Sequence, residues 1–140
     1  MAKKILIVDD DKHIPKLTKA ALDRAGYEVL VATDGMEALA AIERDRPDLV
    51  LLDVAMPNMD GFETLRRLKS ATATCSIRIV IVTARDGDHD LTRAWRAGAD
   101  GYLVKPFTPT GLLEMVKTVL NDLRAGEPRA QMWPRTPWQS

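Results

Sequence analysis

The chain has 140 residues, of which 46% are hydrophobic and 29% charged, and its twenty basic residues balance twenty acidic ones. These values are typical of one ordinary globular domain with enough chain for a sizeable core. The zero net charge argues against a general nucleic-acid surface, and the single cysteine, Cys75, excludes an internal disulfide.

The apolar run near the N-terminus covers only residues 5–8. It is too short for the apolar region of a signal peptide or for a membrane span. We therefore expect a cytoplasmic protein with no membrane contact.

Strand and helix signals alternate from the start of the chain. Residues 5–8 predict a buried strand, and a helix over 12–25 follows, with apolar residues at helical spacing and Gly26 at its end. The second strand is expected over 27–32. Asp34 then opens a second helix with the pattern of a capping box.

The middle of the chain continues this alternation. Residues 48–53 place four aliphatic residues between two acids, which is typical of a strand buried on both faces of a parallel sheet. A loop over 54–61 follows, and Asp60 has the form of a helix start. The fourth strand is expected within 77–83, which is rich in β-branched residues.

The last strand–helix pair has clear boundaries. Trp95 lies in a helix that Gly98 ends, and its spacing favours packing on the core over contact with a partner. The fifth strand is expected over 101–105. Thr108 then caps a long apolar helix that ends at Gly126.

Five strand–helix pairs in alternation predict a doubly wound α/β fold, a flavodoxin-like three-layer sandwich around a five-stranded parallel sheet. The expected strand order is 2-1-3-4-5, with the switch point between the first and third strands. Asp9, Asp10 and Asp53 would then lie at adjacent strand ends beside one crevice.

Charged and hydroxyl side chains follow four of the five strands: Asp9 and Asp10, Asp53, Thr83 and Lys105. Each alone reads as a surface residue at a strand end, but five in this order favour a common site. Carboxylates bind a hard ion such as Mg²⁺, and a lysine and a hydroxyl add a charge and a donor for phosphoryl oxygens. We infer that Asp53 is a nucleophile for a phosphoryl group.

The sequence resembles the response regulator receiver domain, the module of two-component signalling represented by the chemotaxis regulator. The resemblance covers about residues 3–123. The motifs that carry it are Leu6-Ile7-Val8-Asp9-Asp10-Asp11, Leu51-Leu52-Asp53-Val54-Ala55-Met56-Pro57 with Asp60-Gly61, Val82-Thr83-Ala84, and Gly98-Ala99-Asp100-Gly101-Tyr102-Leu103-Val104-Lys105-Pro106-Phe107.

The resemblance implies a role for each site residue. Asp53 would be the phosphoacceptor of a phosphorelay and would form an aspartyl phosphate. Mg²⁺, with Mn²⁺ as a substitute, would be held by Asp10, Asp53, the Ala55 backbone carbonyl and, through water, Asp9.

The remaining roles concern the phosphoryl group and the switch. Thr83, the Ala84 backbone N–H and Lys105 would bind the phosphoryl oxygens, and Pro106 would follow a cis peptide bond. Thr83 and Tyr102 would form a switch that changes the surface of the fourth helix, fifth strand and fifth helix.

The implied partners are a sensor histidine kinase or phosphotransfer protein, and a downstream protein target or output domain. A homodimer formed on phosphorylation is a further alternative. Such a domain regulates and is not an enzyme beyond its self-catalysed phosphotransfer and dephosphorylation. Direct binding of nucleic acid is not expected, since no helix-turn-helix domain follows the fifth helix.

Two other functions stay open. A receiver-like scaffold that works without phosphorylation usually lacks part of the acidic pair, acceptor and lysine, which are all present here. A phosphatase of the haloacid dehalogenase type needs a second aspartate two residues after the nucleophile. That position is Ala55, which weakens this alternative.

The end of the chain differs from the rest. We expect residues 1–126 to form the receiver domain and residues 127–140 to form a tail or the start of a linker. The tail contains three prolines, Trp133 and Trp138. Its tryptophans could alternatively dock on a partner or on the protein's own surface.

Overall fold

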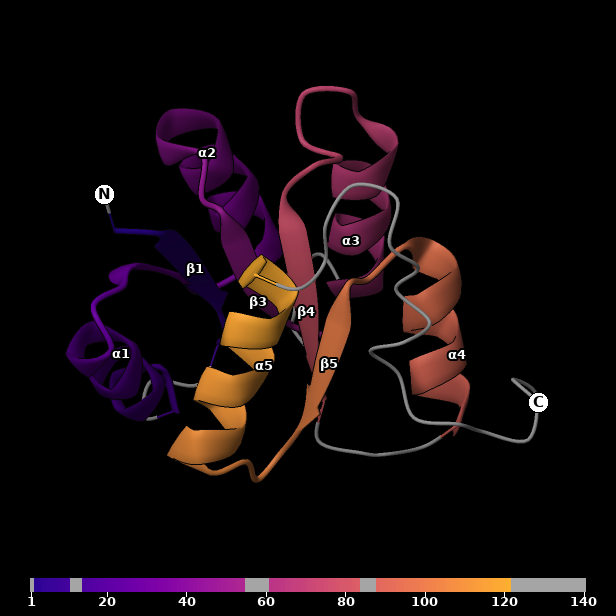
Figure 1. Ribbon diagram of the computed structural model, residues 1–140. Coiled ribbons are helices and arrows are strands. Elements are labelled where there is room, and N and C mark those ends of the chain that lie inside the picture. The colour runs from indigo at the N-terminus through magenta and orange to yellow at the C-terminus, as the bar shows by residue number, and fades with distance from the viewer. Residues whose placement is uncertain (1, 11–13, 55–60, 84–87, 122–140) are drawn as a thin grey trace.

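The computed structural model describes residues 2–10, 14–54, 61–83 and 88–121 (Figure 1). Five strands and five helices alternate along these residues, in the order β1 (Lys4–Val8), α1 (Ile14–Arg24), β2 (Glu28–Ala32), α2 (Gly35–Asp45), β3 (Leu49–Asp53), α3 (Gly61–Ser70), β4 (Arg78–Thr83), α4 (Asp88–Ala97), β5 (Gly101–Val104) and α5 (Pro109–Asn121).

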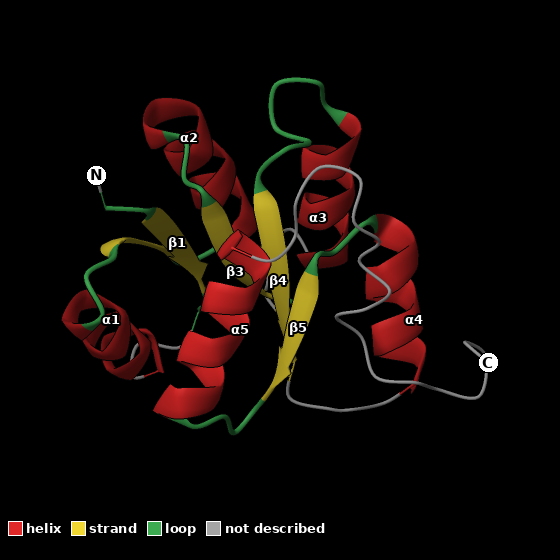
Figure 2. Ribbon diagram, in the orientation of Figure 1, coloured by secondary structure: helices red, strands yellow, loops and turns green. Residues whose placement is uncertain are grey.

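All neighbouring strands pair in parallel, and the sheet order is β2-β1-β3-β4-β5. The helices lie in a layer on each side of the sheet (Figure 2). This arrangement confirms the predicted doubly wound topology and the three layers. The switch point lies between β1 and β3, as expected.

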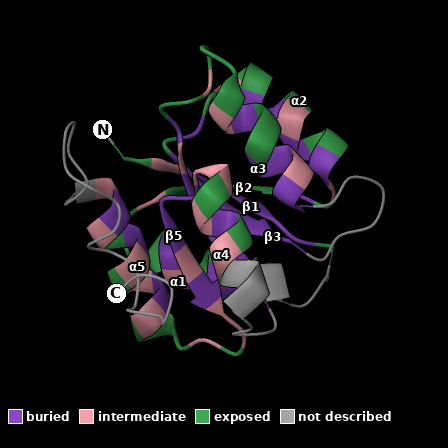
Figure 3. Cartoon of the chain, turned by 90° about the vertical axis from the view of Figure 1, so that its right-hand side faces the viewer, coloured by how far each residue is buried: buried purple, intermediate pink, exposed green. Residues whose placement is uncertain are grey.

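Each strand sends alternate side chains to opposite faces of the sheet, which gives the molecule two cores. Leu6 and Val8 pack in the cluster under α2, α3 and α4, whereas Ile5 and Ile7 pack in the cluster under α1 and α5. Burial of one such side chain stabilises a protein by about 1.5–3 kcal/mol. The central strands are buried on both sides (Figure 3), and every residue of β3 is buried.

The predicted strand boundaries are correct to within one residue at all five strands. Asp48 was expected to begin the third strand, but β3 begins at Leu49. The Asp48 side chain accepts a hydrogen bond from the Lys4 backbone N–H at 2.7 Å. Its backbone still pairs on both sides, since its N–H donates to the Lys4 carbonyl at 2.8 Å and its carbonyl accepts the Arg78 N–H at 3.2 Å, so the difference is one of boundary assignment.

The predicted helix signals also have structural counterparts. Asp34 caps α2, because its side chain accepts the Glu37 backbone N–H at 2.8 Å, and Thr108 accepts the Gly111 N–H at 2.9 Å. Trp95 on α4 is partly buried and packs against the core, which confirms its predicted role. Among the described residues, no helix is both long and apolar enough to cross a membrane.

A partly buried ion pair joins α3 to the segment that enters β5. Asp100 is 4% exposed, and its carboxylate accepts hydrogen bonds from Lys69 Nζ at 2.7 Å and from the Ile79 backbone N–H at 2.9 Å. Lys69 Nζ also donates to the Ile77 carbonyl at 2.8 Å. These contacts fix the start of β5 against β4.

Replacement of Asp100 by alanine should lower the free energy of unfolding by about 3 kcal/mol, because it leaves the partly buried Lys69 ammonium without its counter-ion and the buried Ile79 N–H without its acceptor. Urea denaturation measures this change. Asp23→Ala is the control, since its pair with Lys19 on α1 is exposed and contributes little. Equal effects of the two substitutions would show that the Asp100 pair does not hold β5.

Candidate functional site

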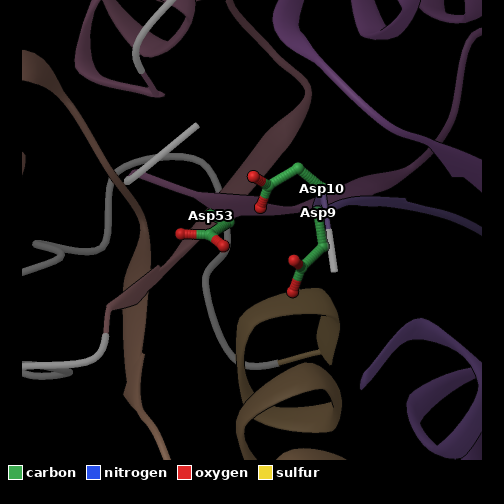
Figure 4. Close-up of side chains that lie close together, drawn as sticks. All are labelled: Asp9, Asp10 and Asp53. Carbon is green, nitrogen blue, oxygen red and sulfur yellow. The ribbon is translucent and has the colours of Figure 1, made fainter. Parts of the chain in front are cut away.

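The strand order brings three carboxylates together at one edge of the sheet. Asp9 and Asp10 follow β1, and Asp53 is the last residue of β3. Val8 pairs with Leu52 in the register of these neighbouring strands, so the two strand ends lie side by side. The three side chains lie close together at that edge (Figure 4).

The carboxylates form a set that could hold a cation. One oxygen from each of Asp9, Asp10 and Asp53 lies within 4.8 Å of the others. Asp9 and Asp53 are buried, at 4% and 5% exposure, and Asp10 is exposed. Like charges at this separation repel one another, and burial strengthens the repulsion.

Lys105 supplies the opposite charge. Its Nζ lies 3.1 Å from Asp53 Oδ2 and 3.2 Å from Asp9 Oδ2, so one ammonium contacts both buried carboxylates. Burial alone would lower the pKa of Lys105, but the hydrogen bond and charge of Asp53, with those of Asp9, raise it above its ordinary value. The lysine is therefore charged at neutral pH.

Thr83 ends β4 beside these groups. Thr83 is 3% exposed, and its backbone carbonyl accepts a hydrogen bond from the Lys105 N–H at 2.7 Å. The contact joins the end of β4 to the residue that follows β5. Thr83 is thus held next to the lysine by backbone pairing.

Tyr102 lies on β5, opposite Ile81 on β4. It is half-buried and packs against the cluster under α2, α3 and α4, and burial raises the pKa of its phenol. Thr83 lies two residues after Ile81, and side chains two apart in a strand share a face. Thr83 and Tyr102 therefore face the same side of the sheet, the side that α4 covers.

Gly61 is a site residue whose role the sequence analysis missed. A Cβ at this position would lie 2.4 Å from Val54 Cα and 2.6 Å from the Asp53 carbonyl oxygen, both backbone atoms. Only glycine allows α3 to begin so close to the end of β3. In the sequence Gly61 is part of a helix start and of the Asp60-Gly61 motif, but neither pattern shows that a larger side chain there would meet the end of β3.

Two predicted site residues, Ala55 and Ala84, lie outside the described residues. The peptide bond between Lys105 and Pro106 is cis. The structure thus brings together Asp9, Asp10, Asp53 and Lys105, and it places Thr83 at the adjoining strand end.

Comparison with known proteins matches residues 5–117 to the model of the response regulator receiver domain. The chain belongs to this family. Family membership places it among regulatory domains rather than enzymes, and the aspartyl phosphatase alternative is therefore rejected.

Relatives of the receiver domain include longer regulators. The chain is 39% identical to the alkaline phosphatase synthesis transcriptional regulatory protein PhoP of Bacillus subtilis, over 94% of this chain and 54% of the relative. It is 41% identical to the response regulator PleD of Caulobacter vibrioides, over 91% of this chain and 29% of the relative. The chain thus spans about half the length of these curated relatives or less.

Solved structures give the same fold. The receiver domain superposes on the chemotaxis response regulator CheY4 of Vibrio cholerae with a TM-score of 0.81 and 37% identity, covering 86% of this chain and all of that one. It also superposes on a CheY-like receiver domain protein of Methanospirillum hungatei with a TM-score of 0.81 and 37% identity, covering 87% and 96% of the two chains.

The donor set fits a small hard cation. All three candidate ligands are carboxylate oxygens, which suit Mg²⁺, and opposite ligands of that ion lie about 4.2 Å apart. Oxygens within 4.8 Å of one another need only a small inward movement, or one bridging water, to share it.

Replacement of Gly61 by alanine should lower the free energy of unfolding by about 2 kcal/mol, because the added methyl group forces backbone apart. It should also weaken Mg²⁺ binding, since the displaced backbone carries Asp53. Urea denaturation and calorimetric titration measure the two effects. The control is Gly111→Ala, where the nearest atom is the Thr108 hydroxyl at 3.2 Å. Unchanged Mg²⁺ affinity in the Gly61 variant would show that this glycine does not contribute to the metal site.

Replacement of Lys105 by methionine should tighten Mg²⁺ binding about tenfold, equivalent to about 1.4 kcal/mol, because the ammonium repels a cation bound by the same carboxylates. Calorimetric titration with MgCl₂ gives the affinity. Lys19→Met, on the exposed face of α1, should leave it unchanged. Weaker binding by the Lys105 variant would mean that the lysine orients the carboxylates rather than competing with the ion.

Proposed function

We propose that Asp53 accepts a phosphoryl group from a phosphohistidine and that the resulting aspartyl phosphate controls the binding surface of α4, β5 and α5. Membership of the receiver family implies a histidine kinase partner. The observation that carries the proposal is the contact of Lys105 with Asp53 and Asp9 at one strand edge.

In the proposed reaction, a carboxylate oxygen of Asp53 attacks the phosphorus atom in line with the bond to the donor imidazole. The new O–P bond forms as the N–P bond breaks, and the imidazole leaves as the neutral base after it takes up a proton. This transfer needs positioning and charge stabilisation more than covalent help.

The residues around Asp53 have separate tasks in this proposal. Asp9 and Asp10 would hold Mg²⁺ with Asp53, and the ion would offset the repulsion between carboxylate and phosphoryl donor. Lys105 would move from its carboxylate contacts to an oxygen of the phosphoryl group. The Thr83 hydroxyl would donate a hydrogen bond to another oxygen, and the Ala84 N–H would do the same.

The switch would follow from the movement of Thr83. Thr83 and Tyr102 face the same side of the sheet, so an inward shift of the threonine would open space for the tyrosine ring. The charge added by phosphorylation would then shift the balance between two positions of the Tyr102 ring under α4. The change would reach a downstream partner through α4, β5 and α5.

The wider context is also part of the proposal. Residues 1–126 would be the receiver unit, and residues 127–140 would lead away from it as a tail or linker. The donor would be a sensor kinase or phosphotransfer protein in the cytoplasm. The output would be a protein target, an attached output domain, or a second phosphorylated copy.

Incubation with acetyl phosphate and Mg²⁺ tests the acceptor. The wild-type chain should gain one acid-stable, base-labile phosphoryl group by intact-mass analysis, and Asp53→Asn should gain none. Asp45→Asn is the matched control, because Asp45 ends α2 beside the start of β1, where its backbone carbonyl accepts a hydrogen bond from Lys4 Nζ, at the edge of the sheet opposite to Asp53. Full labelling of the Asp53→Asn variant would show that another residue is the acceptor. A wild-type chain that binds Mg²⁺ but gains no label would favour the phosphorylation-independent scaffold.

A further inference from the structure

An apolar groove lies between α1 and α5, on the face of the sheet opposite α4. Its volume is about 560 Å³. Its apolar lining includes Leu17 and Ala21 from α1, and Phe107, Pro109, Leu112 and Leu113 from the start of α5 and the turn before it. The two helices lie side by side in Figure 1. The groove is of a size that binds small ligands or large side chains.

Leu17 makes this groove unusual. It belongs to the apolar spacing that predicted α1, yet its side chain is 77% exposed, the highest value among the exposed large hydrophobic residues described. Its neighbours Ala21, Phe107 and Leu113 pack against the core but are only partly buried. One exposed leucine is common on protein surfaces, but Leu17 adjoins a groove with an apolar lining, and such a contiguous surface suits an apolar partner better than an ion or a phosphate.

The sequence contains a segment with the chemistry to fill the groove. Residues 127–140 lie outside the described residues, and they hold two of the three tryptophans of the chain together with three prolines. A tryptophan side chain buries about 150–250 Å², and prolines hold a segment extended before it binds. Proline-containing segments commonly dock in apolar grooves lined by aromatic residues, as Phe107 lines this one.

The tail can reach the groove. α5 is described as far as Asn121, and Leu113 lies about 12 Å back along that helix. Residues 122–133 span about 40 Å when fully extended. Trp133 can therefore return to the groove with slack in the chain.

Attachment favours the protein's own tail over a second copy. A segment tethered by a short flexible link has an effective concentration on the order of millimolar. A second copy at micromolar concentration competes at a disadvantage of about a thousandfold. We propose that residues 127–140 dock intramolecularly in the groove between α1 and α5, with a tryptophan indole against Leu17 and Phe107. The inference does not depend on the phosphorylation of Asp53.

Docking also has a consequence for the edge of the site. Phe107 lies two residues after Lys105, so the groove begins where the site ends. A tail in the groove covers the surface beside the carboxylates on the side of α1. It leaves the opposite face of the sheet, which α4 covers, open to other partners.

Tryptophan fluorescence of the full chain tests the proposal. In a Trp95→Phe background, all indole emission comes from Trp133 and Trp138. Its maximum should lie to the blue of that of a free peptide with the sequence of residues 127–140. Adding Leu17→Glu should shift it to the peptide value, whereas Met36→Glu, at an exposed methionine on α2, should not. Emission equal to that of the free peptide before either change, or equal shifts with both, would overturn the proposal.

Two further measurements complete the test. Dilution from about 100 μM to about 1 μM should leave the spectrum unchanged for an intramolecular contact, and loss of the blue shift on dilution would assign the groove to a second copy and overturn the proposal. In the chain with native Trp95, replacing Trp133 and Trp138 by alanine should shift the methyl resonances of Leu17, Leu112 and Leu113. Unchanged resonances would also overturn it.

Discussion

The contact of one ammonium with two buried carboxylates is the interaction on which the site depends. Asp9 and Asp53 would repel each other at the end of β1 and β3, and Lys105 lies within 3.2 Å of both. The lysine follows β5, which lies at the edge of the sheet, whereas the two carboxylates follow or end the central strands β1 and β3. The ion pairs therefore link the edge strand to the central strands, with β4 between them. A charged group bound among these side chains would change the contacts of the lysine, which directly follows β5.

The fold supplies this contact because parallel strands end at the same edge. Alternation of side chains gives each strand one face for α1 and α5 and another for α2, α3 and α4. The strand ends are left for polar groups, which need not take part in either core. The ion pair of Asp100 with Lys69 acts at the opposite end of the same strands, where it fixes the start of β5.

Much of this arrangement could be predicted from the sequence. Acids follow residues 5–8, and a buried run ends in Asp53. Because these two strands are neighbours in the predicted order, their acids were expected to meet in one site. Long-range contacts without a local pattern could not be predicted. Lys69 and Asp100 are 31 residues apart, Gly61 resembles a helix start, and the exposure of Leu17 depends on how closely α5 approaches α1.

The position of β3 at the centre of the sheet has a consequence for dynamics. β3 pairs with a strand on each side, whereas β5 pairs only with β4. Local opening of a sheet starts at its margins, where fewer hydrogen bonds must break, and reaches the middle only near global unfolding. Amide exchange is therefore expected to be slower in β3, which ends at Asp53, than in β5, which carries Tyr102. Fluctuations at the margin of the sheet can then occur while the Asp53 carboxylate stays in place.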